Sequence, residues 1–227
     1  MSDYQYETRN VAAFVSQIVR YVAAGHYFYI RVLIPEGKDV AAVDAKLLAR
    51  YDIKKKRWQR KRRHLKQTAS IHYLRCNRCA VLMLTKGNHE QFYQDHASSI
   101  RDIRRQALKV FGYSIRFGVS VNGKARKISV RLDQEKYREV RDHFLTICAW
   151  DSYRSPHRLE REFSRLPHQP YGPVFVQLHS IWKAVNRSRR KRGFEPLAFA
   201  CLRNKLKLGK VFVETTKHAP LHSSTGE

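Results

Sequence analysis

The stretch YSIRFGVSVNGKARKISVRL, Tyr113–Leu132, decides the fold class of this chain. Apolar residues alternate with polar or small residues on both sides of Asn122-Gly123, a dipeptide that favours the two-residue turn between antiparallel strands. The alternating apolar residues are Tyr113, Ile115, Phe117, Val119, Val121, Ile128, Val130 and Leu132. The stretch therefore predicts a β-hairpin that buries one face.

Upstream of the hairpin, predicted strands and helices alternate. The run YFYIRVLI (27–34) is rich in β-branched and aromatic residues and is followed by Pro35, which predicts a strand. Strand-like runs also occupy 71–75 and 80–85. Apolar residues at helical spacing predict helices over 11–22, 40–51 and 92–107. From the first strand onward the order is strand, helix, two strands, helix and hairpin, which is the split βαβ pattern.

The sequence therefore predicts an α+β fold: a ferredoxin-like (split βαβ) antiparallel sheet with helices on one face, plus a C-terminal helical extension. Residues 1–25 are expected to form an N-terminal helix, 26–150 an α+β core with a basic insertion at 50–66, and 151–227 a basic helical extension and tail. In the extension, Val174, Leu178, Ile181, Trp182 and Val185 form an apolar stripe. This fold carries many functions, so it narrows the architecture and not the activity.

The charge of the chain points to a polyanionic partner. It has 45 Lys and Arg against 19 Asp and Glu, for a formal net charge of +26. Such a surplus repels itself in a compact state unless a polyanion neutralises it. Nucleic acid is the commonest polyanion, and each neutralised phosphate also releases counterions. An anionic membrane surface is the rival partner.

The location expected from the sequence is cytoplasmic or nucleoid-associated. No run approaches the roughly 18 apolar residues of a membrane span, and the polar start SDYQYETRN does not resemble a secretory signal. The four cysteines are too few and too unevenly spaced for a disulfide framework in a chain of this length. We expect an intracellular protein without a membrane partner, and other proteins of a nucleoprotein complex are possible partners.

The strongest functional signal is the segment 50–66, which holds ten Lys or Arg and a single acid, Asp52. Like charges at this density destabilise a helix, and a phosphate backbone accounts for them better than a solvated face, a localisation signal or a membrane surface does. Its candidate nucleic-acid-binding residues, the first basic cluster, are Lys54, Lys55, Lys56, Arg57, Trp58, Arg60, Lys61, Arg62, Arg63 and Lys66. Trp58 is either a base-stacking ring, worth about 1–3 kcal/mol, or a buried anchor.

A second group of cations lies near the end of the last predicted helix. The second basic cluster is Arg187, Arg189, Arg190, Lys191 and Arg192. The helix macrodipole favours cations at a helix C-terminus, but that accounts for only part of this charge. Two clusters far apart in the sequence predict a groove or a two-sided clamp around the phosphate backbone.

The predicted sheet offers a third surface. Tyr27, Tyr29 and Arg31 share one face of the first strand, and Arg116 and Arg131 lie on the polar side of the hairpin. An open sheet face with Tyr and Arg is how RNA-recognition modules stack bases. The alternative is that additional helices cover this face.

Two motifs suggest metal chemistry. Cys76-Asn77-Arg78-Cys79 is a CxxC motif, but a second CxxC or a spaced His pair that would complete a zinc site is missing, so a tight turn between strands is favoured. The string 87–90, Gly-Asn-His-Glu, resembles one motif of calcineurin-like metallophosphatases, but its companion motifs are missing. No cofactor or metal is therefore predicted.

The functional hypothesis is a nucleic-acid-binding protein that holds the phosphate backbone with its two basic clusters. Such a protein could be an accessory factor of a mobile element, a replication complex or a ribonucleoprotein. The alternative is a metal-dependent nuclease or strand transferase in which Asp95 and Asp102, seven residues apart on one predicted helix, hold a divalent cation. The catalytic residues of that alternative are otherwise unknown, and a divalent cation is expected only if it holds.

Overall fold

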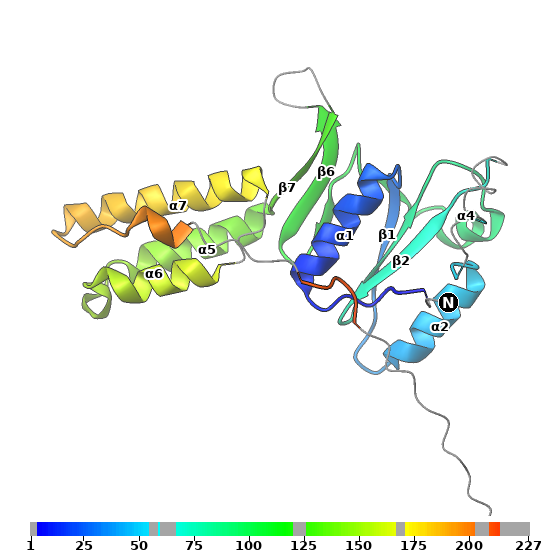
Figure 1. Cartoon of the computed structure of the whole chain (residues 1–227), viewed down its shortest axis with the longest axis horizontal. Coiled ribbons are helices and arrows are strands. Elements are labelled where there is room, and N and C mark those ends of the chain that lie inside the picture. The colour runs from blue at the N-terminus through cyan, green and yellow to red at the C-terminus, as the bar shows by residue number, and fades with distance from the viewer. Residues whose placement is uncertain are drawn as a thin grey trace, which may run out of the picture.

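The computed structural model describes residues 4–54, 59, 67–119, 126–166, 171–202 and 209–213. Within them the chain is a mixed α+β protein with two antiparallel sheets and six α-helices (Figure 1). The helices are α1 (Val11–Ala23), α2 (Val40–Arg50), α4 (Glu90–His96), α5 (Gln134–Ile147), α6 (Pro156–Arg165) and α7 (Gly172–Lys191). The strands are β1 (Phe28–Leu33), β2 (Ile71–Cys76), β3 (Cys79–Leu84), β4 (Arg101–Asp102), β5 (Leu108–Val110), β6 (Tyr113–Val119) and β7 (Arg126–Leu132). The 3-10 turns η1 (Asp151–Tyr153) and η2 (Phe199–Leu202) complete the set.

The first sheet has the order β2-β3-β1-β4, and each neighbouring pair is antiparallel. Every residue of the central strand β3 is buried, because helices cover both of its faces. Met83 packs on the α1 side, whereas Leu82 and Leu84 pack against α2 and α4. The expectation of helices on one face only is thus corrected: α1 covers the second face.

The second sheet, β5-β6-β7, contains the predicted hairpin. Tyr113 pairs with Leu132 and Ile115 pairs with Val130, and all four side chains are buried, which confirms the hairpin. Its apolar face is buried at this end only, since Val119 is 65% exposed. Its Asn122-Gly123 turn lies outside the described residues.

The hairpin does not supply the last strand of the first sheet. The helix expected over 92–107 ends at His96, and β4 pairs with β1 at the sheet edge instead. Two consecutive serines, Ser98 and Ser99, follow α4, and serine hydroxyls compete with helical backbone hydrogen bonds. The chain can therefore turn into β4 and bury Ile103 in the core.

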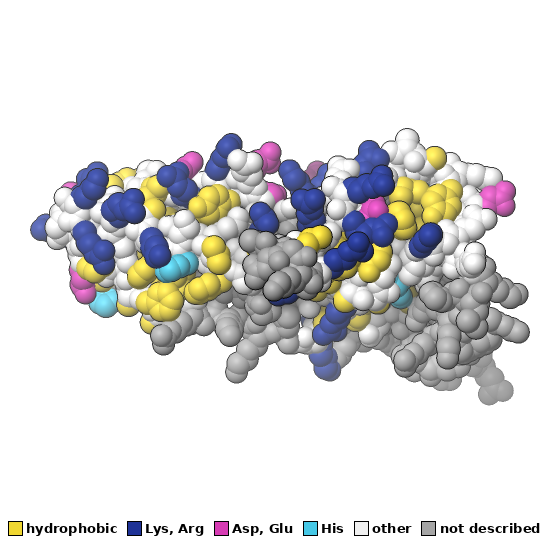
Figure 2. Space-filling view, turned by 90° about the horizontal axis from the view of Figure 1, so that it is seen from above, with side chains coloured by type: hydrophobic (Ala, Val, Ile, Leu, Met, Phe, Trp, Pro, Cys, Tyr) yellow, Lys and Arg dark blue, Asp and Glu magenta, His cyan; other side chains and the backbone are white. Residues whose placement is uncertain are grey.

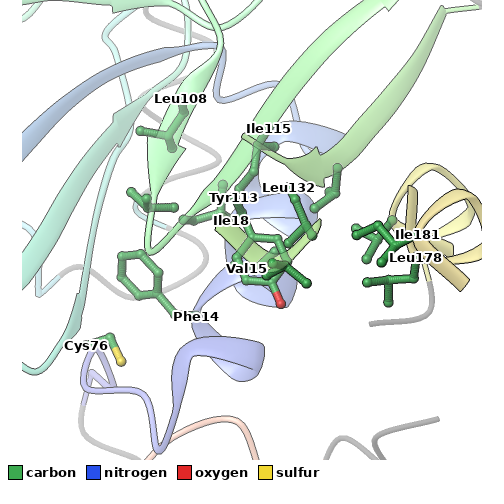
Figure 3. Packing of buried hydrophobic residues seen from close by; sticks show 14 of the residues in the cluster. Phe14, Val15, Ile18, Cys76, Leu108, Tyr113, Ile115, Leu132, Leu178 and Ile181 are labelled. Atoms are coloured by element: carbon green, nitrogen blue, oxygen red, sulfur yellow. The ribbon is translucent and has the colours of Figure 1, made fainter. Parts of the chain in front are cut away.

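The helical extension packs onto the second sheet through α7, and α5 packs against the same helix. Val174, Leu178, Ile181 and Val185 of α7 are buried as the apolar stripe predicts, whereas Trp182 is half-buried. Figure 3 shows Leu178 and Ile181 on the side of α7 that faces β7 and α1. One continuous apolar cluster thus joins the helical extension to both sheets. Among the helices that the structure describes, none combines the length and apolar content needed to cross a bilayer.

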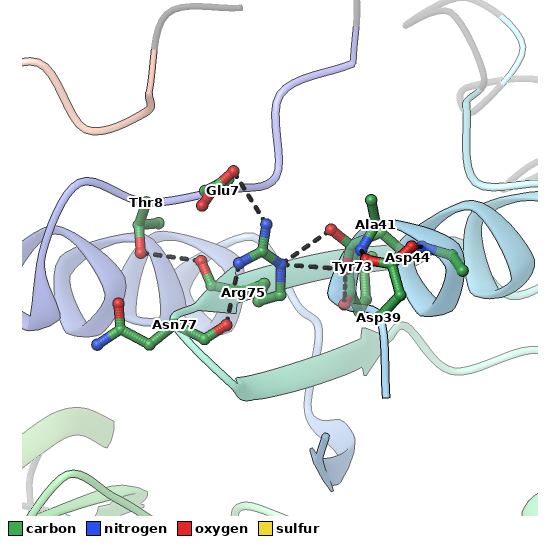
Figure 4. Close-up of polar contacts among 9 residues, drawn as sticks. Glu7, Thr8, Asp39, Ala41, Asp44, Tyr73, Arg75 and Asn77 are labelled. Atoms are coloured by element: carbon green, nitrogen blue, oxygen red, sulfur yellow. Dashed lines mark hydrogen bonds and ion pairs between the residues drawn. The ribbon is translucent and has the colours of Figure 1, made fainter. Parts of the chain in front are cut away.

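A buried ion pair fixes α2, the helix that leads into the basic segment. The Arg75 guanidinium on β2 lies 2.9 Å from the Asp44 carboxylate of α2 and 2.9 Å from Glu7 of the N-terminal segment (Figure 4). The Tyr73 hydroxyl donates to Asp44 at 2.5 Å, and burial is the main cause that raises the pKa of Tyr73. Because each polar group of this set has a charged or hydrogen-bonded neighbour, the network can remain buried and hold α2 against the sheet.

Candidate nucleic-acid interface

The first basic cluster lies largely outside the described residues. Lys54, four residues beyond the end of α2, is exposed, whereas Lys55, Lys56, Arg57, Trp58, Arg60, Lys61, Arg62, Arg63 and Lys66 are not described. The structure does describe the two points at which this segment leaves and rejoins the core.

The departure point is held by a polar contact between α2 and α4. Arg50 donates two hydrogen bonds of 2.6 Å to the Asp95 carboxylate. The Tyr51 hydroxyl donates to Asp95 at 2.9 Å and lies 2.7 Å from Nε2 of His96. Only 2% of Tyr51 and of Ile53 is exposed, so the chain is anchored up to Lys54.

The pKa shifts of the groups in this contact are those expected of a structural contact. Hydrogen bonds from Arg50 are the main cause that holds the pKa of Asp95 well below its usual range. Burial, followed by the hydrogen bond to Asp95, raises the pKa of Tyr51 to about 12. Burial also lowers the pKa of His96. A phenol with a raised pKa is a poor nucleophile at neutral pH, and a carboxylate engaged by a guanidinium is a poor metal ligand.

The return point is held by the string 87–90. Thr68 forms a parallel bridge with Asn88. The Asn88 amide donates to the Gln67 carbonyl, and the Ala69 amide donates to the Asn88 carbonyl, both at 3.0 Å. Gly87 has a φ of 145° and lies so close to the backbone of 67–69 that an added Cβ would sit 2.5 Å from the Gln67 carbonyl oxygen. His89, two residues after Gly87, caps α4. The glycine, asparagine and histidine of this string therefore close the base of the basic segment.

We expect Gly87→Ala to lower the free energy of unfolding by about 2–3 kcal/mol, because the new methyl group meets three backbone atoms closer than 3.0 Å and the φ is strained. Chemical denaturation measures this change. Gly37→Ala is the matched control, since nothing lies within 4 Å of its Cβ position, and it should stay within about 0.5 kcal/mol of the parent protein. Equal stabilities of the two variants would contradict the closed base.

The carboxylates of the nuclease alternative do not lie on one helix. Asp95 is in α4 and paired with Arg50, whereas Asp102 is in β4, where Arg104 donates to both of its oxygens. The prediction of a single helix was wrong because α4 is shorter than its apolar spacing suggested. Among the described residues, no group of three or more His, Cys, Asp or Glu side chains is placed to hold a metal ion.

The CxxC motif forms the tight turn that was favoured for it. Cys76 and Cys79 are cross-strand partners at the ends of β2 and β3, and Asn77 takes a φ of 50° between them. Both thiols are buried, and burial is the main cause that raises their pKa values. A raised pKa disfavours the thiolate, which is the form that binds metals and attacks electrophiles.

The second basic cluster is divided by burial. Arg187, Arg190, Lys191 and Arg192 are exposed on the last turns of α7. Arg189 is 0% exposed and donates to the backbone carbonyls of Glu195, Tyr153 and Arg154 at 2.6–2.8 Å. Its assignment as a phosphate ligand is therefore corrected. Its position was readable in the sequence, because Arg189 follows Val185 by four residues and so continues the apolar stripe.

The sheet face with tyrosines is not an open stacking platform. Tyr29 is buried, and its hydroxyl donates to the Gln106 and Ala107 carbonyls at 3.2 and 3.1 Å. The Tyr27 ring is stacked on Phe117 at 5.0 Å, and the Arg104 guanidinium lies 4.9 Å from its centroid. This face is thus covered, by α1 as the alternative expects and also by the second sheet, which the alternative did not include.

The structure instead brings together cations that belong to no single basic run of the sequence. Two pockets flank the loop 103–107, where the two sheets meet, and we call them the junction pockets. One, of about 550 Å³, is lined by Tyr29, Arg31, Ser98, Ser99, Arg101, Gln106, Ala107, Leu108 and Lys109. The other, of about 440 Å³, is lined by Asp102, Arg104, Arg105, Arg116, Phe117, Gly118, Val119 and Arg126. Seven cations thus line the pockets, against one carboxylate, Asp102, which is already paired with Arg104.

Some of these cations are oriented by the backbone. Arg31 donates to the Lys109 carbonyl at 3.0 Å, and Arg101 donates to the Ser98 carbonyl at 2.8 Å. Each guanidinium has five N–H donors, so both retain donors for an anion. Because β1, β4, β5, β6 and β7 all contribute, no local sequence pattern marks these pockets.

The surface seen from above in Figure 2 carries the same imbalance. Lys and Arg side chains lie over the helical part and over the sheet part, with few Asp or Glu side chains between them.

A comparison with known protein families and with curated proteins found no match to this chain.

Proposed function

We propose that this protein binds nucleic acid through its phosphate backbone, as a non-catalytic accessory component of a nucleoprotein complex. The observation that carries the proposal is the pair of junction pockets, which seven cations line and in which the one carboxylate, Asp102, is paired with Arg104. Concave, cation-lined sites of this kind fit phosphate oxygens, since guanidinium groups match them with paired hydrogen bonds.

The two basic clusters extend this proposed surface. The closed base between α2 and α4 supports a fixed origin for the first cluster, and the exposed members of the second cluster continue along α7. Phosphates held at several such places account for the net charge of +26.

We also propose a ferredoxin-like (split βαβ) arrangement for the first sheet, supported by the order β2-β3-β1-β4 with α2 and α4 on one face.

The experiment replaces six cations of the first basic cluster with serine. We expect Lys54, Lys55, Lys56, Arg60, Arg62 and Arg63 to Ser to weaken binding of labelled DNA and RNA about 100-fold or more, at all sequences tested. Fluorescence anisotropy measures the affinity, and circular dichroism checks that the secondary structure is retained.

The matched control removes the same charge elsewhere, at Arg20, Lys38, Lys46, Lys86, Arg138 and Arg141, which are all exposed. If both six-serine variants lose the same affinity, the protein responds to net charge alone, and the first cluster is not a contact surface. If neither the parent protein nor its variants bind any nucleic acid, the proposed function is wrong.

A further inference from the structure

An exposed group of aromatic rings lies on the helical extension, outside the junction pockets and the two basic clusters. The aromatic patch consists of Phe175, Val176, His179 and Trp182 on α7, and Phe199 on η2. Phe175 and Phe199 are each 39% exposed and Val176 is 65% exposed. Large apolar side chains gathered at a surface mark a binding site more often than isolated ones do.

The rings of the patch hold one another in fixed orientations. The His179 ring is stacked between Phe175, at 6.0 Å and 13°, and Trp182, at 5.6 Å and 22°. The Phe199 ring meets each of these three rings nearly edge-on at 5.6–6.4 Å. The exposed rings therefore form a preorganised surface, and little conformational entropy is lost when a flat ligand stacks on it.

Cations continue from the patch along the same helix. Lys183 follows His179 by four residues, and Arg187 follows Lys183 by four, so these side chains are neighbours on one face of α7. Both are exposed, and Arg190 and Lys191 extend the row. Over the helical part of Figure 2, hydrophobic side chains lie beside a histidine and are bordered by Lys and Arg.

We infer that the aromatic patch stacks unpaired bases, while the cations that follow it on α7 hold the adjoining phosphates, so that the helical extension binds single-stranded nucleic acid. A row of exposed rings next to a row of cations matches a single strand, which offers exposed bases and a charged backbone side by side. A duplex hides the faces of its bases. A protein partner would have to match the cations with acidic side chains, and a second copy of this chain would bring like charges together.

The test uses three labelled probes of equal length: a thymidine single strand, an abasic single strand and a duplex. We expect the thymidine strand to bind at least about tenfold more tightly than the abasic strand. The double variant Phe175→Ala, Phe199→Ala should bind the thymidine strand as weakly as the abasic one and leave the abasic and duplex affinities unchanged. Trp150→Ala, which removes a ring that is 52% exposed outside the patch, is the matched control and should change none of the three.

This inference rests on the proposed function, and the abasic strand separates the two. If no probe binds, phosphate binding and stacking both fail. If abasic and thymidine strands bind equally to the parent protein, stacking alone is wrong, and this comparison needs no variant. A dimer on gel filtration that disappears in the double variant would assign the patch to self-association and overturn the inference.

Discussion

Nucleic-acid affinity is expected to fall about a thousandfold or more when the salt concentration rises from 50 to 200 mM. The two basic clusters and the junction pockets contain enough cations for about six to ten phosphate contacts. Each contact releases condensed counterions, and added salt opposes that release, so the logarithm of affinity falls linearly with the logarithm of salt concentration. Anisotropy titrations across a salt series give the slope.

The six-serine variant of the first basic cluster provides the internal control for this slope. If its six side chains each contact a phosphate, the variant's slope should be smaller by about 4–5, according to whether the nucleic acid is single- or double-stranded. The charge-matched control variant should keep the slope of the parent protein. A nearly flat salt dependence of the parent protein would refute backbone binding.

Local patterns predicted the elements of this fold that local interactions determine. The hairpin 113–132 was found from alternation, and the α7 core stripe from helical spacing, because each depends on neighbours within a few residues. The length of α4 was not predicted correctly. Ile100 and Ile103 keep helical spacing after His96, although the chain has already left the helix and turned into β4. The spacing of apolar residues indicates which residues are buried, but it does not show whether they lie in a helix, a strand or a loop.

The candidate interface was predictable only where its charge is contiguous in sequence. Segment 50–66 is recognisable from composition alone, whereas Arg104 of the loop 103–107 and Arg126 of β7 line the same pocket only because the two sheets meet in space. The covering of Tyr29 likewise depends on the loop 103–107 and on α1, which are remote in sequence. Contacts of this kind follow from tertiary packing and leave no local pattern.

Arg189→Met is expected to lower the free energy of unfolding by about 3–5 kcal/mol and to leave nucleic-acid affinity unchanged in the folded protein. The guanidinium is fully buried, and it satisfies three backbone carbonyls, in η1, in the residue after η1, and beyond the end of α7. Methionine fills much of the same volume but donates no hydrogen bond, so the three carbonyls would lose this partner, and the bond to the Tyr153 carbonyl is a buried one. Chemical denaturation measures the loss.

Arg190→Met is the matched control, because it removes the same charge from the adjacent, exposed residue of the same helix. It should change the stability by no more than about 0.5 kcal/mol and instead weaken nucleic-acid binding. Arg189→Met should thus lower the stability and leave binding unchanged, whereas Arg190→Met should weaken binding and leave the stability nearly unchanged. If Arg189→Met is as stable as Arg190→Met, the three backbone contacts do not hold the end of α7 against η1. Weaker nucleic-acid binding by a stable Arg189→Met variant would restore Arg189 to the binding surface, because only a side chain that leaves its buried position can reach a phosphate.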